Sequence, residues 1–213
     1  MVPMIKVLVA DDHPVVRQGL RQILTEADDI EVAAEAEDGY EILDKVRNQE
    51  FDVIVLDITM PGLMGLDVLK QLKSERPELP VLILSMHPEE QYAIRVLRAG
   101  ASGYLTKASA PNKLTAAIRK LHRGGKYVSS SLAERLADEV GGDLTKLPHE
   151  TLSDREYQVM CLIASGKTVT QIADQLALSV KTVSTYRTRI LEKMRMQSNA
   201  ELTHYAIENK LVD

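Results

Sequence analysis

The clearest candidate for chemistry in this sequence is Asp57, which directly follows the apolar run at residues 53–56. Four apolar residues, three of them β-branched, are typical of a strand that is covered on both faces. Pro61 and Gly62 then end any regular element. Asp57 could instead cap the next helix, but the helical pattern begins only at residue 66, which weakens this alternative. Asp57 therefore stands where open parallel sheets place their ligand sites.

Other polar side chains end segments of the same kind: Asp11-Asp12 after residues 5–10, Ser85 after residues 80–84, and Lys107 after residues 103–106. In a doubly wound parallel sheet, right-handed crossovers bring all these strand ends to one edge. We therefore expect one acidic pocket that also contains a hydroxyl and an ammonium group.

The composition of this pocket predicts its chemistry. Three carboxylates cannot all stay ionised unless a cation joins them or one takes up a proton. Ligands that are all oxygen favour Mg²⁺ over zinc. With Mg²⁺ bound by Asp12 and Asp57, the Asp57 carboxylate would attack phosphorus as a nucleophile, and Lys107 would offset charge on the transferred group. The Ser85 hydroxyl would then bond the new phosphate and make room for Tyr104 to rotate, a structural readout of phosphorylation.

The elements that position these residues alternate along residues 1–124. Strands are predicted at residues 5–10, 31–36, 52–57, 80–85 and 103–106. Helices are predicted to begin near Pro14, Gly39, Leu66, Pro88 and Asn112. The first helix has the apolar stripe Val15, Val16, Leu20, Ile23 and Leu24. Five strands alternating with five helices predict an α/β fold, a doubly wound five-stranded parallel sheet of the flavodoxin-like type.

The pocket residues belong to a larger set: Asp11-Asp12, Asp57, Met60-Pro61, Gly65, Ser85, Tyr104 and Lys107. This set resembles the receiver domain of two-component response regulators. The resemblance implies that Asp57 accepts a phosphoryl group from a sensor histidine kinase. It also implies that Mg²⁺ is held by Asp12, Asp57 and the Thr59 carbonyl, with Asp11 acting largely through water. The pair Leu63-Met64 departs from the usual Met and acidic residue, and we expect this departure to be neutral.

Two rival functions are less well supported. An aspartyl-phosphate phosphatase needs a second carboxylate two residues after its nucleophile, and Thr59 stands there. The phosphoryl group should therefore persist, which suits a switch rather than an enzyme. Gly166-Lys167-Thr168 resembles the end of a phosphate-binding loop, but Cys161 stands where that loop needs a glycine, and a helix is predicted where it needs a strand.

Residues 125–148 are predicted to be a linker, and residues 149–213 a small all-helical domain. In the linker, Ser129-Ser130-Ser131 would cap a short helix over residues 132–140, which Gly141-Gly142-Asp143 ends. In the domain, Ser153 and Glu156 form a capping box. Three further helices are expected. Thr170 would cap the first, and Ser179 would cap the second, whose apolar face is Val180, Val183, Ile190, Leu191 and Met194. The last helix would use Leu202, Tyr205, Ala206 and Ile207.

The helices capped by Thr170 and Ser179 would form a helix-turn-helix. Hydroxyls and positive charges gather on the outer face of the second helix: Lys181, Ser184, Thr185, Thr188 and Arg189. A solvated charged face is the simplest alternative. Against it, short hydroxyls let a helix approach base edges closely, while Lys and Arg reach phosphates.

The segment from Leu152 to Leu211 is similar to the LuxR-type DNA-binding domain, and the whole chain resembles NarL/FixJ-class response regulators, with some likeness to the GacA/UvrY branch. The resemblance implies that the DNA groove is faced by Ser184, Thr185 and Thr188, and that phosphates are contacted by Lys181, Thr182, Arg189 and Lys193. Arg187 either touches DNA or pairs with Glu156. The last helix, around Leu202 and Tyr205, would form the dimer contact.

Composition and charge limit the remaining classes of protein. The 213 residues carry a net charge of −5, with 18 basic against 23 acidic residues up to position 148 and 8 against 8 after it. A neutral domain binds DNA weakly as a monomer, so a homodimer on two half-sites is expected. The five histidines lack ligand spacing and are predicted to be surface or capping residues. Since the sequence has no long apolar run, no membrane-spanning helix is predicted. The single cysteine, Cys161, cannot form an internal disulfide, which fits the reducing cytoplasm.

We therefore predict a cytoplasmic transcriptional regulator that is phosphorylated on Asp57 with Mg²⁺ and binds promoter DNA as a dimer. The alternative is a receiver-containing interaction module whose helical tail dimerises without sequence-specific DNA binding.

Overall fold

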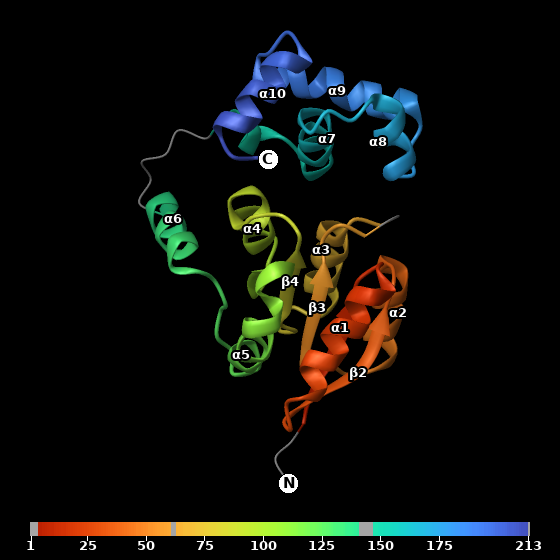
Figure 1. Cartoon of the computed structure of the whole chain (residues 1–213), viewed down its shortest axis with the longest axis vertical. Coiled ribbons are helices and arrows are strands. Elements are labelled where there is room, and N and C mark those ends of the chain that lie inside the picture. The colour runs from red at the N-terminus through yellow and green to blue at the C-terminus, as the bar shows by residue number, and fades with distance from the viewer. Residues whose placement is uncertain (1–3, 61–62, 141–146, 213) are drawn as a thin grey trace. The chain divides into compact units, whose positions relative to one another are not determined.

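The computed structural model of the chain describes residues 4–60, 63–140 and 147–212. The chain forms two compact units, Met1–Arg135 and Leu136–Asp213, and Figure 1 gives the helices and strands of each. The predicted turn at Pro61-Gly62 and the predicted helix end at Gly141-Gly142-Asp143 lie outside the described residues. None of the helices within the described part of the chain is long and apolar enough to cross a membrane.

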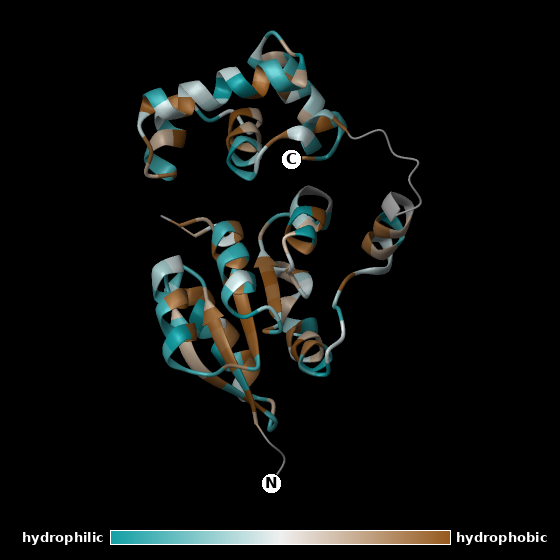
Figure 2. Cartoon of the chain, turned by 180° about the vertical axis from the view of Figure 1, so that it is seen from behind, coloured by the Kyte–Doolittle hydropathy of each residue, from teal (hydrophilic) through white to brown (hydrophobic). Residues whose placement is uncertain are grey.

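The first unit is built around the predicted five-stranded parallel sheet. Its strands are β1 (Ile5–Ala10), β2 (Ile30–Ala36), β3 (Val53–Asp57), β4 (Val81–Ser85) and β5 (Gly103–Thr106), and their order is β2-β1-β3-β4-β5. All five residues of the central strand β3 are buried, because β1 and β4 pair with its two sides and helices cover its two faces. Figure 2 shows these strands as the most hydrophobic segments of the unit.

Five helices and one 3₁₀ helix accompany the sheet: α1 (Pro14–Thr25), α2 (Gly39–Asn48), α3 (Gly65–Glu75), α4 (Glu89–Arg98), η1 (Lys107–Ser109) and α5 (Ala110–His122). Leu24 of α1 and Leu121 of α5 share one core with Val9 and Val55. Alternate strand residues point to the opposite face, so the sheet has a core on each side.

The apolar stripe predicted for α1 is wrong at one position. Val15 is 81% exposed, whereas Leu20 and Leu24 are buried. Val15 is the second residue of α1, and a residue there is turned about a third of a helical circle away from the buried side. The start of α5 also differs, because η1 takes up the residues between β5 and Ala110.

The second unit contains η2 (Pro148–Thr151), α7 (Asp154–Ala164), α8 (Val169–Gln175), α9 (Val180–Met194) and α10 (Asn199–Glu208). The linker helix α6 (Ser130–Val140) spans the division between the two units. Helix α7 packs against α9 and α10, and α8 packs against α9. Tyr157, Ile190 and Leu202 are among the side chains buried between these helices.

Caps fix where these helices begin. The Ser153 and Glu156 capping box is confirmed, with the Ser153 amide donating to Glu156 Oε2 at 2.8 Å, and Ser179 caps α9 as predicted. The cap predicted at Thr170 is wrong. Thr168 caps α8 in its place, because Gln171 stands three residues later and its side chain accepts from the Thr168 amide at 2.8 Å.

Candidate functional site

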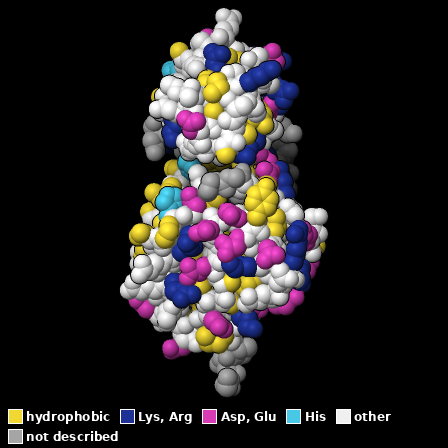
Figure 3. Space-filling model, turned by 90° about the vertical axis from the view of Figure 1, so that its right-hand side faces the viewer, with side chains coloured by type: hydrophobic (Ala, Val, Ile, Leu, Met, Phe, Trp, Pro, Cys, Tyr) yellow, Lys and Arg dark blue, Asp and Glu magenta, His cyan; other side chains and the backbone are white. Residues whose placement is uncertain are grey.

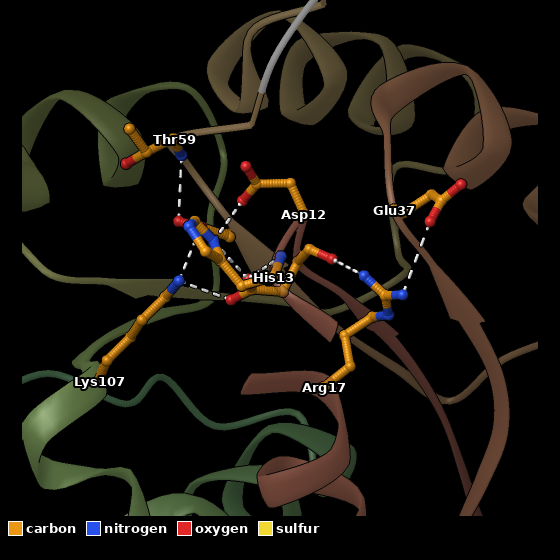
Figure 4. Close-up of polar contacts among 8 residues, drawn as sticks. Asp12, His13, Arg17, Glu37, Thr59 and Lys107 are labelled. Carbon is orange, nitrogen blue, oxygen red and sulfur yellow. Dashed lines mark hydrogen bonds and ion pairs between the residues drawn. The ribbon is translucent and has the colours of Figure 1, made fainter. Parts of the chain in front are cut away.

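The predicted acidic pocket forms where β1, β3 and β5 end. Lys107 Nζ lies 2.6 Å from Asp11 Oδ2 and 2.8 Å from Asp57 Oδ2. Figure 4 draws Lys107 with its polar contacts as dashed lines. Asp11 and Asp57 are 0% and 2% exposed. Three side chains from strand ends that are about fifty residues apart in sequence therefore meet in one buried cluster.

The main chain around Asp57 is held by two close contacts. The Thr59 amide donates to Asp57 Oδ1 at 3.0 Å, which turns the chain directly after β3. A Cβ on Gly65 would lie 2.6 Å from the Ile58 Cα and 2.7 Å from the Asp57 carbonyl oxygen. Only glycine therefore lets α3 begin against the backbone of this loop.

One ammonium group, that of Lys107, offsets part of the negative charge in the pocket. Burial raises the pKa of Asp57, and the hydrogen bonds from Lys107 and the Thr59 amide only partly oppose this effect. Burial alone would lower the pKa of Lys107, but its bonds to Asp11 and Asp57 outweigh burial and raise it. Lys107 therefore stays charged at neutral pH and acts as the counter-ion of two buried carboxylates.

The carboxylate oxygens also have the arrangement that a divalent cation needs. Asp11 Oδ2 and Asp12 Oδ1 are buried, and their close contacts are the Lys107 ammonium at 2.6 Å and the His13 Nδ1 at 2.8 Å. One ligand atom from each of Asp11, Asp12, His13 and Asp57 lies within 4.8 Å of the others. Oxygen donors of this kind fit Mg²⁺, so the pocket has the composition of a Mg²⁺-dependent phosphorylation site.

Two side chains beside the pocket were not predicted. Figure 4 shows the His13 ring turned toward Asp12, with Nδ1 2.8 Å from Asp12 Oδ1. Arg17, one turn into α1, donates from Nη1 to the Asp11 carbonyl oxygen at 2.6 Å and lies 3.6 Å from Glu37. Their positions in the sequence could have indicated this placement. His13 directly follows Asp12, and Arg17 stands four residues after His13, so that it lies one helical turn above the same loop.

The two predicted switch residues bond to the same loop residue. Ser85 is fully buried, and its Oγ accepts from the His87 amide at 3.0 Å. Tyr104 is also fully buried, and its hydroxyl donates to the His87 carbonyl oxygen at 2.8 Å. Tyr104 is therefore in its buried position in this structure, and the rotation predicted for it would start from here.

The predicted DNA-binding face lies on α9, in the second unit. The face of the first unit drawn in Figure 3 carries Asp and Glu side chains with Lys and Arg among them, so it is not a basic surface of the kind that contacts DNA phosphates. The exposed residues of α9 include Lys181, Ser184, Thr185, Thr188 and Arg189, and Val183, Ile190 and Met194 are buried. The Thr185 hydroxyl donates to the Lys181 carbonyl and the Thr188 hydroxyl to the Ser184 carbonyl. Each hydroxyl oxygen therefore keeps a free side as an acceptor.

Several expectations for this helix need correction. Val180 is 48% exposed and does not belong to the apolar face. Arg187 does not pair with Glu156, because its Nε donates to Asn199 Oδ1 at 2.7 Å. Glu156 is bonded by Lys193 instead, at 2.6 Å. Burial works to raise the pKa of Glu156, yet the bonds from Lys193 and Ser153 bring that pKa below its usual value. Lys193 thus joins α9 to α7 within the domain.

The predicted dimer residues of α10 differ in exposure. Leu202 is 1% exposed and packs inside the domain, whereas Ile207 is 55% exposed. Tyr205 is half-buried, and its hydroxyl lies 2.8 Å from His149 Nδ1 in η2. Leu202 and Tyr205 therefore fix the position of α10, and Ile207 is the large apolar side chain that this helix leaves exposed.

Comparisons with known proteins match both parts of the chain. Residues 7–119 match the response regulator receiver domain, and residues 150–206 match the bacterial regulatory proteins of the luxR family. The chain is 37% identical to response regulator UvrY of Escherichia coli (strain K12) over 98% of this chain and 96% of that protein. It is 39% identical to response regulator GacA of Pseudomonas protegens over 99% of both chains.

Solved structures of one relative cover both domains. The RcsB response regulator of Salmonella typhimurium matches with a TM-score of 0.72 and 27% identity, over 97% of this chain and 98% of that one. An RcsB–DNA complex matches with a TM-score of 0.59 and 29% identity, over 95% and 97%. The acidic pocket, the exposed face of α9 and these matches agree, and leave the dimerising-tail alternative unsupported. The chain belongs to the two-component response regulators that carry a receiver domain and a LuxR-type DNA-binding domain, a family of transcription factors rather than enzymes.

Proposed function

We propose that Asp57 is the phosphoacceptor of this response regulator. The observation that carries the proposal is the pairing of Asp57 with Lys107 inside a cluster that also contains Asp11 and Asp12. Asp57 Oδ2 bonds Lys107 and Oδ1 bonds the Thr59 amide, so the carboxylate is held in one orientation. A nucleophile held in this way loses little freedom when it reacts.

The residues suited to hold Mg²⁺ are Asp11, Asp12 and Asp57, with the Thr59 carbonyl as a further oxygen. When bound, the ion would offset negative charge on the incoming phosphoryl group and on its donor. Lys107 would then be free to follow the phosphoryl oxygens, because the ion takes over its role as counter-ion of Asp11. The phosphodonor is a sensor histidine kinase or a small phosphorylated compound.

The switch would act through His87. A phosphoryl group on Asp57 offers strong acceptor oxygens to the Ser85 hydroxyl. If Ser85 turns toward them, its contact with the His87 amide changes, and so does the position of the carbonyl that Tyr104 bonds. Phosphorylation would thus move the loop between β4 and α4 and alter the packing of Tyr104.

The output would be promoter binding by a dimer. Ser184, Thr185 and Thr188 are suited to face the major groove because they are short and exposed. Contacts to phosphates would come from Lys181, Thr182, Arg189 and Lys193, with Lys193 exchanging Glu156 for a phosphate. Dimer contact through α10 would use its exposed side, with Leu202 and Tyr205 supporting the helix from beneath.

The proposed domains are a receiver over residues 1–124, a linker over 125–148 and a DNA-binding domain over 149–213. The proposed location is the cytoplasm. The test is DNA binding by the full chain to random-sequence duplexes, with and without a small phosphodonor and Mg²⁺. We expect the phosphodonor to increase both dimer formation and the bound fraction, and to enrich a recurring pair of half-sites on repeated selection. Binding that ignores the phosphodonor, or that enriches no sequence, would contradict the proposal.

A further inference from the structure

The acidic pocket contains one ligand that magnesium does not favour. His13 follows the pair Asp11-Asp12, and its Nδ1 lies 2.8 Å from Asp12 Oδ1 and 3.3 Å from Asp11 Oδ1. Nearest-neighbour ligand atoms on an octahedral ion with bonds of about 2.1 Å are about 3 Å apart. The His13 nitrogen therefore already lies at ligand spacing from one oxygen of each carboxylate, within a group whose ligand atoms all lie within 4.8 Å of one another.

The main chain fixes His13 beside the pocket and leaves its ring free to adjust. The His13 amide donates to Asp11 Oδ1 at 2.9 Å, and Pro14 begins α1 immediately afterwards. The ring makes no cap bond to α1, and its side chain is 65% exposed. Because most of the ring is exposed, a small rotation toward a bound ion would disturb little packing.

The nature of the ligand sets the consequence. Carboxylate and carbonyl oxygens suit Mg²⁺, whereas an imidazole nitrogen suits first-row ions such as Co²⁺, Ni²⁺ and Zn²⁺. Magnesium gives up its water reluctantly, so it would keep a water where His13 could bind. An ion of intermediate softness (a borderline ion), such as Co²⁺, would instead gain the His13 nitrogen as a ligand at that position.

We propose that His13 is an additional metal ligand of the phosphorylation pocket and raises its affinity for borderline divalent ions such as Co²⁺ relative to Mg²⁺. This inference rests on the proposed function, because it assumes that Asp12 and Asp57 bind a divalent ion. Its consequence is that the pocket responds to which divalent ion is available as well as to the phosphodonor. The competing interpretation is that His13 is only an ion-pair partner of Asp12.

The test is calorimetric titration of the full chain with CoCl₂ and, separately, with MgCl₂. The variant is His13→Asn, because Asn is a favoured helix cap and keeps α1 in place. The matched control is His122→Asn, since His122 lines a different cavity with Phe51 and Leu79. Histidines elsewhere in the chain, such as His204 beside Glu208, are unchanged in both variants.

We expect His13→Asn to weaken Co²⁺ binding at the pocket about tenfold or more and to change Mg²⁺ binding by less than about twofold. His122→Asn should change neither. A second readout is proton NMR of the histidine rings, in which small amounts of Co²⁺ should broaden the His13 signals before those of His122. An unchanged ratio of Co²⁺ to Mg²⁺ affinity in His13→Asn would overturn the inference alone. Unchanged Mg²⁺ binding in Asp12→Asn would overturn the metal site of the proposed function, and the inference with it.

Discussion

Ser85 and Tyr104 are joined through the main chain of a single residue. The His87 amide donates to the Ser85 hydroxyl at 3.0 Å, and the Tyr104 hydroxyl donates to the His87 carbonyl oxygen at 2.8 Å. Ser85, which would bond the phosphoryl group, therefore contacts the amide of His87, and Tyr104, which would change its packing in response, contacts the carbonyl of the same residue. One loop is enough to couple them.

Replacing Tyr104 with Phe should separate phosphorylation from its output. The variant loses the bond to His87, which lowers the free energy of unfolding by about 1 kcal/mol, and leaves Asp57 and Lys107 in place. We expect unchanged phosphoryl uptake and a smaller increase in DNA binding on addition of phosphodonor, both measured on the full chain. Tyr40→Phe is the control, because Tyr40 is 69% exposed. A phosphodonor response equal to that of the wild type would show that Tyr104 is not part of the switch.

The charge on Asp57 should cost stability at neutral pH. Burial raises the pKa of Asp57 above its ordinary 3.8, so the folded chain binds this proton more tightly than the unfolded chain does. The stabilising contribution of the protonated form is present at low pH and is lost as the pH rises through the folded pKa. Asp57→Asn should therefore unfold at higher urea concentration than the wild type at pH 7 in EDTA.

The higher stability of the Asn variant should diminish as the pH falls through the raised pKa of Asp57, because the wild-type carboxyl then takes up its proton. Saturating Mg²⁺ should stabilise the wild type more than the variant, since only the wild type keeps the full set of carboxylates. Equal urea midpoints at all pH values would mean that Lys107 balances Asp57 completely.

The first residues of the proposed linker should prove to stabilise the receiver fold. The Tyr127 amide donates to the Ser102 carbonyl and the Tyr104 amide to the Tyr127 carbonyl, each at 3.0 Å. A Cβ on Gly103 would lie 2.7 Å from the Tyr127 carbonyl oxygen. Gly103→Ala should thus force this segment off β5 and destabilise the receiver by about 1–3 kcal/mol.

Gly19→Ala is the matched control. Gly19 lies inside α1 with nothing within 4 Å of an added Cβ, so alanine should stabilise the receiver by about 0.5–1 kcal/mol. Thermal unfolding of the two variants should therefore shift in opposite directions. A Gly103→Ala variant as stable as the wild type would mean that the contact with Tyr127 yields easily.

Lys193 should affect both the stability and the DNA binding of the second unit, whereas Arg189 should affect DNA binding alone. Lys193→Ala leaves the buried Glu156 without its charged partner, so we expect a loss of about 1–2 kcal/mol of stability. Because the pKa of Glu156 is held below its usual 4.5, the stability due to this pair is present above pH 4.5 and is lost as the pH falls through the lower, folded pKa. The difference between wild type and variant should therefore narrow in acid.

Arg189→Ala should leave stability unchanged and reduce the slope of DNA affinity against salt by about one. Fluorescence titrations of the full chain with DNA at several salt concentrations measure this slope. We expect Lys193→Ala to flatten the slope as well, because Lys193 is proposed to exchange Glu156 for a phosphate. A slope unchanged by Lys193→Ala would remove Lys193 from the phosphate contacts. If neither variant changes it, the exposed face of α9 is only a solvated surface.

Much of the fold and of the pocket could be predicted because each depends on local patterns that tertiary structure does not override. The apolar run before Asp57 has no other stable place than a buried strand, and five such runs separated by helical patterns leave few topologies. Once the sheet is parallel, the convergence of Asp11, Asp57 and Lys107 follows from the handedness of the crossovers.

The remaining features depend on contacts between segments that are distant in sequence. The choice of Lys193 over Arg187 as the partner of Glu156 is set by how α9 lies across α7, which no pattern within α9 encodes. The burial of Leu202 follows in the same way from the packing of α10 on α7. Val15 is exposed because it faces away from the side of α1 that packs on the sheet, although Val16 beside it packs on the core. The Thr168 cap depends on the side chain of Gln171, and the apolar pattern alone favours the nearer Thr170.

The most direct test of the account is phosphoryl transfer to the intact chain from a small phosphodonor with Mg²⁺, measured by mass for the wild type and for Asp57→Asn. We expect a gain of one phosphoryl group in the wild type, no gain in the variant, and no gain in either protein when EDTA removes the metal. A phosphoryl group on Asp57→Asn at the wild-type level would contradict this expectation.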